Sequence, residues 1–192
     1  MRLTPALALM LWAGVAQAQV VLEVPEETPP GYPPFLGAIS GTLGTEAVAW
    51  EFFDFSIGAF DASAWVERDY DGKDVELHLF GYPPGQPEDR RFRVYVEGLF
   101  GKSLAPGVAV APLVEIYRGA DREGPRLTSN GQRAEVVIDS IGPRQENSYL
   151  RHITGTVRAR LCPKGWLLKS CQDIDLRFDT EVQMGSAVPV KE

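Results

Sequence analysis

The chain has few of the residues that most often build catalytic and metal centres. Its 192 residues include two histidines, His78 and His152, and two cysteines, Cys162 and Cys171. Two thiols cannot supply the four ligands of a structural zinc site, and a CxxC redox motif is absent. The sequence also lacks a Gly-x-Ser-x-Gly nucleophile elbow and a glycine-rich phosphate loop. It therefore predicts no catalytic residue, no metal site and no cofactor.

Both histidines lie in segments that alternate as strands do. Ser-His-Asp catalysis needs a serine and an acid that converge on a histidine, and a transition-metal site needs several ligands at characteristic spacing. The sequence shows neither pattern around His78 or His152. We therefore expect both side chains to be hydrogen-bonded or to face solvent. The 26 acidic residues single out no carboxylate pair for hydrolysis.

Positive charge is scarce relative to negative charge. The sequence has 19 Lys and Arg against 26 Asp and Glu, for a formal net charge of −7. Broad nucleic-acid binding needs a cationic surface to displace counterions, and adhesion to anionic lipid also favours basic residues. The acidic balance argues against both. It leaves an unidentified protein or envelope component as the expected partner.

Residues 1–18 have the three parts of an export signal. Arg2 supplies the positive start, residues 3–15 are apolar, and residues 16–18 (Ala-Gln-Ala) form a small-x-small cleavage pattern. The apolar stretch is too short to cross a bilayer of roughly 30 Å as a stable helix. A buried N-terminal helix is the alternative. We expect an exported chain, periplasmic or secreted, without a transmembrane segment.

Export determines how the two cysteines are interpreted. In an oxidising compartment, Cys162 and Cys171 are expected to form a disulfide. The bridge would join the ends of two alternating segments, 149–161 and 173–183, paired as an antiparallel hairpin. The loop between the cysteines carries Lys164, Trp166, Leu167, Leu168 and Lys169.

This loop is the strongest candidate for a contact surface. Trp often dominates interface energetics, so an exposed Trp166 would act as a contact anchor. The alternative is that Trp166 and Leu168 fold back and cap the core.

The remaining chain is organised as one β-rich domain. Five prolines between Pro25 and Pro34 disfavour a sheet strand there. We expect a signal peptide at 1–18, a proline-rich extended leader at 19–36, the domain at 37–184 and a tail at 185–192.

Period-two alternation of apolar and polar residues dominates the domain, and no convincing amphipathic helix interrupts it. This pattern predicts an all-β fold: a single antiparallel β-sandwich of eight or nine strands, with a partly closed or lipocalin-like β-barrel as the alternative. The clearest alternating segments are 64–68, 75–79, 91–97, 153–161 and 173–179; fuller apolar runs at 47–55 and 135–141, and a weaker one at 113–118, are further strands.

One acidic segment is a weak calcium candidate. Asp69, Asp71 and Asp74 alternate around Gly72, and Ca²⁺ needs six to eight oxygen ligands. Lys73 stands where a ligand of an EF-hand-like loop would fall. The alternative is a polar hairpin turn, for which Asp-Gly is a strong signal.

These observations favour an exported β-domain with a binding or structural role. A hydrolase of envelope or extracellular polymers is one alternative, and it would show converging acids or a nucleophile–base pair. A carrier of an apolar small ligand is the other, and it would show an enclosed apolar pocket of several hundred Å³.

Overall fold

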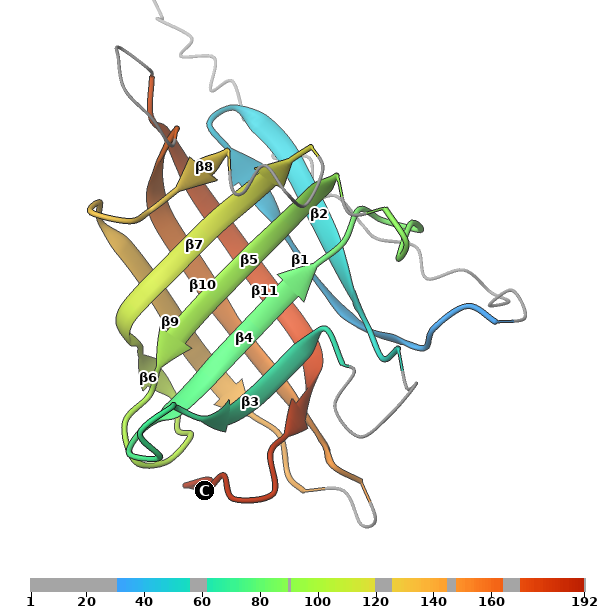
Figure 1. Cartoon of the computed structure of the whole chain (residues 1–192), viewed down its shortest axis with the longest axis vertical. Helices are drawn as coiled ribbons and strands as arrows, with labels where there is room; N and C mark the ends of the chain where they lie inside the picture. The colour runs from blue at the N-terminus through green and yellow to red at the C-terminus, as the bar shows by residue number, and fades with distance from the viewer. Residues whose placement is uncertain are drawn as a thin grey trace, which may run out of the picture.

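The computed structural model describes residues 31–55, 62–89, 91–119, 126–144, 148–163 and 170–191. The described residues form eleven β-strands and no helix (Figure 1). The all-β prediction is therefore confirmed, with more strands than the expected eight or nine. The strands are β1 (Phe35–Leu43), β2 (Glu46–Phe53), β3 (Ala64–Arg68), β4 (Val75–Gly81), β5 (Phe92–Leu99), β6 (Gly107–Val108), β7 (Val110–Arg118), β8 (Leu127–Thr128), β9 (Ala134–Ile141), β10 (Leu150–Pro163) and β11 (Gln172–Met184).

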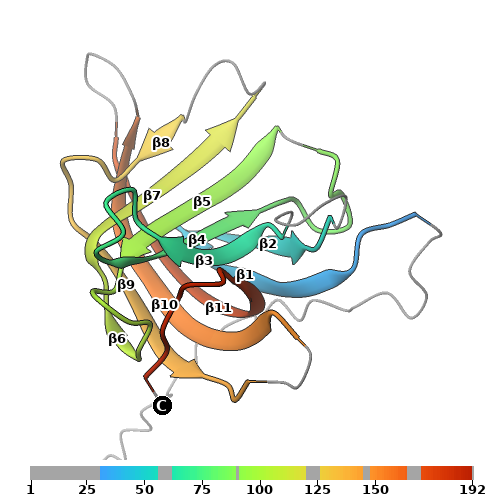
Figure 2. The same ribbon diagram turned by 60° about the horizontal axis from the view of Figure 1, so that its bottom comes forward.

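All eleven strands belong to one sheet whose pairings return on themselves. The order is β2-β1-β11-β3-β4-β5-β7-β8-β10-β9-β6, and β10 also pairs with β11. The route from β11 through β3, β4, β5, β7 and β8 therefore leads by way of β10 back to β11. The β11–β3 pairing is parallel, and the other strand pairings are antiparallel. Figure 2 shows β4, β5 and β7 curving over β1, β10 and β11.

The hydrophobic core lies between these two curved layers. In β11, Ile174, Leu176 and Phe178 are buried, while the residues between them are exposed. Val94 and Val96 of β5 are fully buried, and Tyr95 between them lies on the opposite face and is partly exposed. The alternation predicted from the sequence is therefore the inside–outside alternation of the strands.

The predicted hairpin between the two late strands is present. β10 and β11 pair over twelve residues, from Leu150 opposite Gln183 to Leu161 opposite Gln172. The sulfur atoms of Cys162 and Cys171 lie at disulfide distance, 2.07 Å, where this hairpin ends.

Strand β1 was not predicted, and it begins at Phe35, inside the segment expected as a leader. Its sequence carries Gly37 and Gly41 and so lacks an apolar alternation. Glycine is needed at position 41 because a Cβ there would lie 2.0 Å from the carbonyl oxygen of Asp175 on β11. At the other end of the chain, Val190 forms a parallel bridge with Leu104.

Some predicted features lie outside the described residues. These are the export signal at 1–18, most of the leader, and the contact-loop residues Lys164, Trp166, Leu167, Leu168 and Lys169. Within the described ranges, no helix has the length and apolar character of a membrane span.

Candidate functional site

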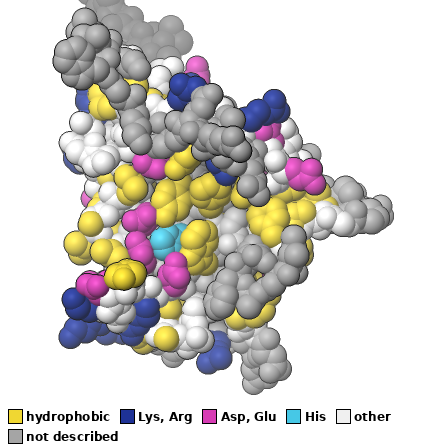
Figure 3. Space-filling model, viewed as in Figure 1, with side chains coloured by type: hydrophobic (Ala, Val, Ile, Leu, Met, Phe, Trp, Pro, Cys, Tyr) yellow, Lys and Arg dark blue, Asp and Glu magenta, His cyan; other side chains and the backbone are white. Residues whose placement is uncertain are grey.

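The outward face of β3, β4 and β5 is lined with rings and carboxylates instead of ordinary solvated side chains. On β4 the inward residues Leu77 and Leu79 are fully buried in the core. Figure 3 shows a histidine in the middle of the opposite face, with acidic and apolar side chains around it. We call six residues of this face the His78 cluster: Trp65, Glu67, Glu76, His78, Tyr95 and Glu97.

Strand register brings these residues together. Trp65 of β3 lies opposite His78 of β4, and His78 lies opposite Glu97 of β5. Residues two positions apart in a strand share a face. Each of the three strands therefore contributes a pair: Trp65 with Glu67, Glu76 with His78, and Tyr95 with Glu97.

His78 is buried although it points away from the core. Its exposed fraction is 7%, because the Trp65 ring stacks on it with a centroid distance of 4.6 Å and an interplanar angle of 14°. The Tyr95 ring lies 6.2 Å away at 23°. Burial lowers the pKa of His78, although Glu67 and Glu97 act in the opposite direction. The imidazole is therefore neutral at neutral pH.

The hydrogen bonds of Tyr95 determine which imidazole nitrogen carries the proton. The Tyr95 hydroxyl donates to Glu97 Oε2 at 2.6 Å, and burial together with Glu97 raises the pKa of Tyr95, which keeps the hydroxyl protonated. With its one proton used, the Tyr95 oxygen accepts from His78 Nδ1 at 2.8 Å. We therefore assign the proton to Nδ1, which leaves a lone pair on Nε2.

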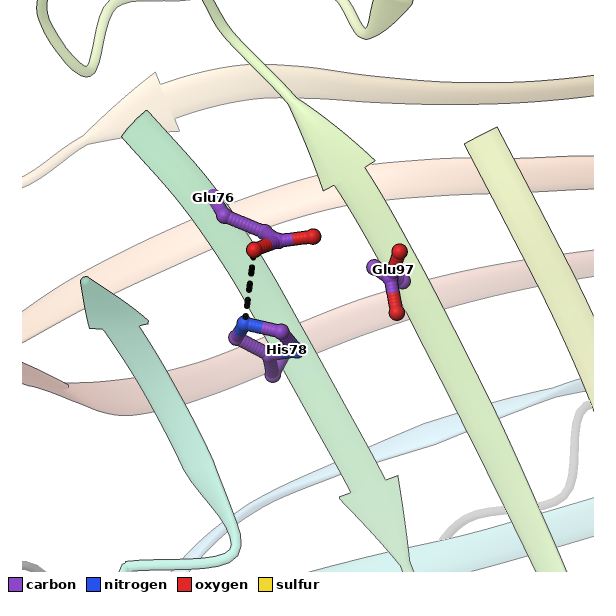
Figure 4. A group of neighbouring side chains, drawn as sticks. All are labelled: Glu76, His78 and Glu97. Atoms are coloured by element: carbon purple, nitrogen blue, oxygen red, sulfur yellow. Dashed lines mark ion pairs between the residues drawn. The ribbon is translucent and has the colours of Figure 1, made fainter. Parts of the chain in front are cut away.

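The Nε2 atom points at carboxylates. It lies 3.5 Å from Glu76 Oε2, as drawn in Figure 4, and 3.4 Å from Glu67 Oε1. It is buried, and none of the residues that the structure describes forms a hydrogen bond with it. Once Glu76 is ionised, the Nε2 lone pair faces only acceptor oxygens, which is unfavourable, and such a group in a folded protein calls for an explanation.

Glu76 is perturbed by the same crowding. Burial raises the pKa of Glu76 to about 7, helped by a hydrogen bond and the charge of Glu97 and by the charges of Glu67 and Asp69. Glu67 is better exposed, and its Oε1 accepts the Trp65 indole N–H at 3.0 Å. Glu76 therefore keeps its proton to a higher pH than an ordinary carboxyl group does.

The donor atoms of the cluster are close enough to hold one ion. Ligand atoms of Glu76, His78 and Glu97 all lie within 4.8 Å of one another. Among the residues that the structure describes, this is the one group of three or more metal-ligating side chains with that property. The arrangement offers one imidazole nitrogen and several carboxylate oxygens to a cation.

The interpretation of His152 from the sequence is confirmed, and that of His78 holds for Nδ1 alone. His152 is partly exposed and its Nε2 lies 2.7 Å from Asp179 Oδ1. His78 is neither solvent-facing nor fully hydrogen-bonded, because the surrounding rings cover it. A usable signal was present in the repeated spacing of a ring and an acid two residues apart: Trp65-x-Glu67, Glu76-x-His78, Tyr95-x-Glu97 and Glu115-x-Tyr117.

The aspartate candidates Asp69, Asp71 and Asp74 lie in the turn between β3 and β4. Asp69 Oδ1 accepts the backbone N–H groups of Lys73 at 2.6 Å and Asp74 at 3.0 Å. Lys73 Nζ lies 3.1 Å from Asp71 Oδ2. The polar hairpin turn is present, and calcium binding there stays a prediction.

A hollow of about 600 Å³ lies beside the start of β10 and the C-terminal segment. Leu150, Met184 and Val188 line it together with Arg144 and Arg151. As far as the described residues define it, the hollow is open to solvent, whereas a carrier of an apolar ligand encloses its cargo.

Comparison of the chain with family models, with curated proteins and with solved structures finds no match. Functional inference therefore depends on the geometry of the His78 cluster.

Proposed function

We propose that this chain is an exported binding protein and that the His78 cluster is its ligand site, selective for a cation. The observation that carries the proposal is the unpartnered, buried Nε2 of His78, aimed at the oxygens of Glu67 and Glu76. A cation held by His78, Glu76 and Glu97, whose ligand atoms lie within 4.8 Å of one another, would satisfy the lone pair and neutralise the neighbouring carboxylates. An anion or a neutral acceptor would add to the repulsion already present.

The charge of the chain supports a cationic ligand. The formal net charge of −7 favours the approach of cations over that of anions. Export is supported by the signal pattern at residues 1–18 and by the disulfide distance between Cys162 and Cys171, since such pairs persist in oxidising compartments.

The architecture suits a binding site on a rigid wall. The closed circuit of strand pairings favours a partly closed barrel rather than a two-sheet sandwich. β4, the central strand of the cluster, has a paired neighbour on each side. Sites on strands are held more precisely than sites on loops.

A thermal-shift screen of the mature chain tests this proposal. The chain is stripped with a chelator and then exposed separately to Zn²⁺, Mn²⁺, Ca²⁺ and spermidine. We expect at least one cation to raise the unfolding temperature of the wild type and of His152→Gln, and to have no such effect on His78→Gln. His152→Gln is a matched control because His152 is the other histidine and also faces a carboxylate. If no cation stabilises the wild type, or His78→Gln responds equally, the proposal fails.

A further inference from the structure

The distances around Nε2 match the edges of a metal coordination polyhedron. A four-coordinate zinc ion with bonds of about 2.0–2.1 Å separates its ligand atoms by about 3.3–3.4 Å. Nε2 lies 3.4 Å from Glu67 Oε1 and 3.5 Å from Glu76 Oε2. The distance between Nε2 and Glu76 Oε2 therefore already nearly equals one edge of such a polyhedron. The third carboxylate, Glu97, places an oxygen within 4.8 Å of the donor atoms of Glu76 and His78.

The imidazole decides the class of ion. Ca²⁺ and Mg²⁺ take oxygen ligands, and Ca²⁺ needs six to eight of them. A neutral imidazole suits Zn²⁺ and the neighbouring divalent transition metals. Here the imidazole is the most buried member of the donor set, with a side-chain exposure of 9%, against 20% for Glu76 and 54% for Glu67.

The other side of the imidazole carries the support that metal-binding histidines commonly have. Such a histidine usually donates its second N–H to a partner that leads to a carboxylate or carbonyl group, which orients the ring and determines the tautomer. His78 Nδ1 donates to Tyr95 Oη at 2.8 Å, and Tyr95 donates to Glu97 at 2.6 Å. The lone pair on Nε2 is thereby directed toward Glu67 and Glu76.

Resting on the proposed function, we infer that the His78 cluster binds one divalent transition-metal ion of the zinc class through His78 Nε2 and the carboxylates of Glu76 and Glu97. Tyr95 is a positioning residue: it holds the imidazole tautomer and does not touch the ion. The half-exposed Glu67 lies on the solvent side, which gives the ion a path of entry.

Direct titration of the chelator-stripped mature chain with Zn²⁺ tests the inference. We expect one site per chain in the wild type. Glu76→Gln and His78→Gln should each weaken it more than Tyr95→Phe does. Tyr95→Phe keeps the ring and removes the hydroxyl, so it should weaken Zn²⁺ binding roughly 10–100-fold. Tyr117→Phe is the matched control, because Tyr117 donates to Glu115 Oε2 at 2.9 Å on the same face without a histidine. It should leave the affinity unchanged.

The visible absorption of bound Co²⁺ is a second measurement, and it would not change if Tyr95 had only a structural role. Bound in place of Zn²⁺, Co²⁺ should give the intense visible absorption of a four-coordinate ion, and Zn²⁺ should displace it. Far-ultraviolet circular dichroism and the unfolding temperature of each metal-free variant confirm that the fold is retained. If His78→Gln does not fold, Glu76→Gln decides whether the metal site exists, and Tyr95→Phe against Tyr117→Phe decides the role of Tyr95.

The outcomes separate the two proposals. If Ca²⁺ or spermidine binds in a His78-dependent manner and Zn²⁺ and Co²⁺ do not, the inference is overturned and the cation-binding function stands. If no cation depends on His78, both fail. Equal Zn²⁺ affinity in Tyr95→Phe and the wild type would overturn the role of Tyr95.

Discussion

The contribution of Glu76 to the stability of the metal-free protein should fall as the pH rises from about 4.5 to 7. Burial and neighbouring carboxylates raise the pKa of Glu76 from 4.5 to about 7. In this window the folded chain binds more protons at Glu76 than the unfolded chain does. The free energy of unfolding therefore falls with increasing pH, which is the reverse of what a salt-bridged carboxylate produces.

The size of the effect follows from the same values. A change in pKa from 4.5 to about 7 corresponds to about 3.4 kcal/mol, at 1.36 kcal/mol for each pH unit. This is a ceiling, because the Glu76 side chain is still 20% exposed to solvent. Solvent screening reduces the effect to about 1–2 kcal/mol, which corresponds to roughly 2–8 °C in the unfolding temperature of a domain this size.

Thermal unfolding of the wild type and Glu76→Gln in chelator, at pH 4.5 to 7.5, measures this effect. The quantity of interest is the difference between the two curves. Burial lowers the pKa of His78, which makes stability rise with pH near 6.5 in both proteins, so the subtraction removes most of that contribution. We expect Glu76→Gln to gain on the wild type as the pH rises. Parallel curves, or a wild type that gains on Glu76→Gln, would refute the crowding of carboxylates argued above.

Three further predictions concern the scaffold. Reduction of the Cys162–Cys171 bridge, with a sequence separation of 9, should lower the free energy of unfolding by about 2.6 kcal/mol in the loop-entropy model. The unfolding temperature should fall by roughly 5–10 °C. An unchanged temperature in calorimetry would mean that the bridge is absent or without effect. Gly155→Ala should destabilise the chain by about 3 kcal/mol or more in urea unfolding, because a Cβ at position 155 would lie 2.1 Å from the Val137 carbonyl oxygen. A loss below about 1 kcal/mol would contradict that packing. Millimolar Ca²⁺ should leave the unfolding temperature unchanged, because the Lys73 ammonium is paired with Asp71; stabilisation that Asp71→Asn abolishes would revive the calcium hypothesis.

The regular strands were predictable because one side of each is simply apolar. Ile174, Leu176 and Phe178 are buried, and the residues between them are exposed, so local alternation was enough. The spacing of the two cysteines likewise allowed the hairpin end to be inferred. Strand β1 was missed because its close approach to β11 requires a glycine at position 41, and glycine erases the alternation by which strands are recognised.

The His78 cluster was missed for a different reason. Strand parity correctly placed His78 away from the core, and an outward position was taken to mean a satisfied or solvated one. Whether an outward side chain is covered depends on neighbours from other strands, here Trp65 and Tyr95. Those neighbours depend on pairings of β4 with β3 and β5, which local sequence does not encode.

The position of β11 has a consequence for the order of folding. This last strand, of thirteen residues, pairs with β1, with β10 and with β3. The pairing of β1 with β11 therefore cannot form until the end of the chain has been synthesised. Contacts between such distant segments make folding slow. A chain still emerging from the ribosome can form local hairpins and cannot close its sheet. For the export proposed above, this delay is useful, because a chain that has not yet folded is still able to thread through a membrane.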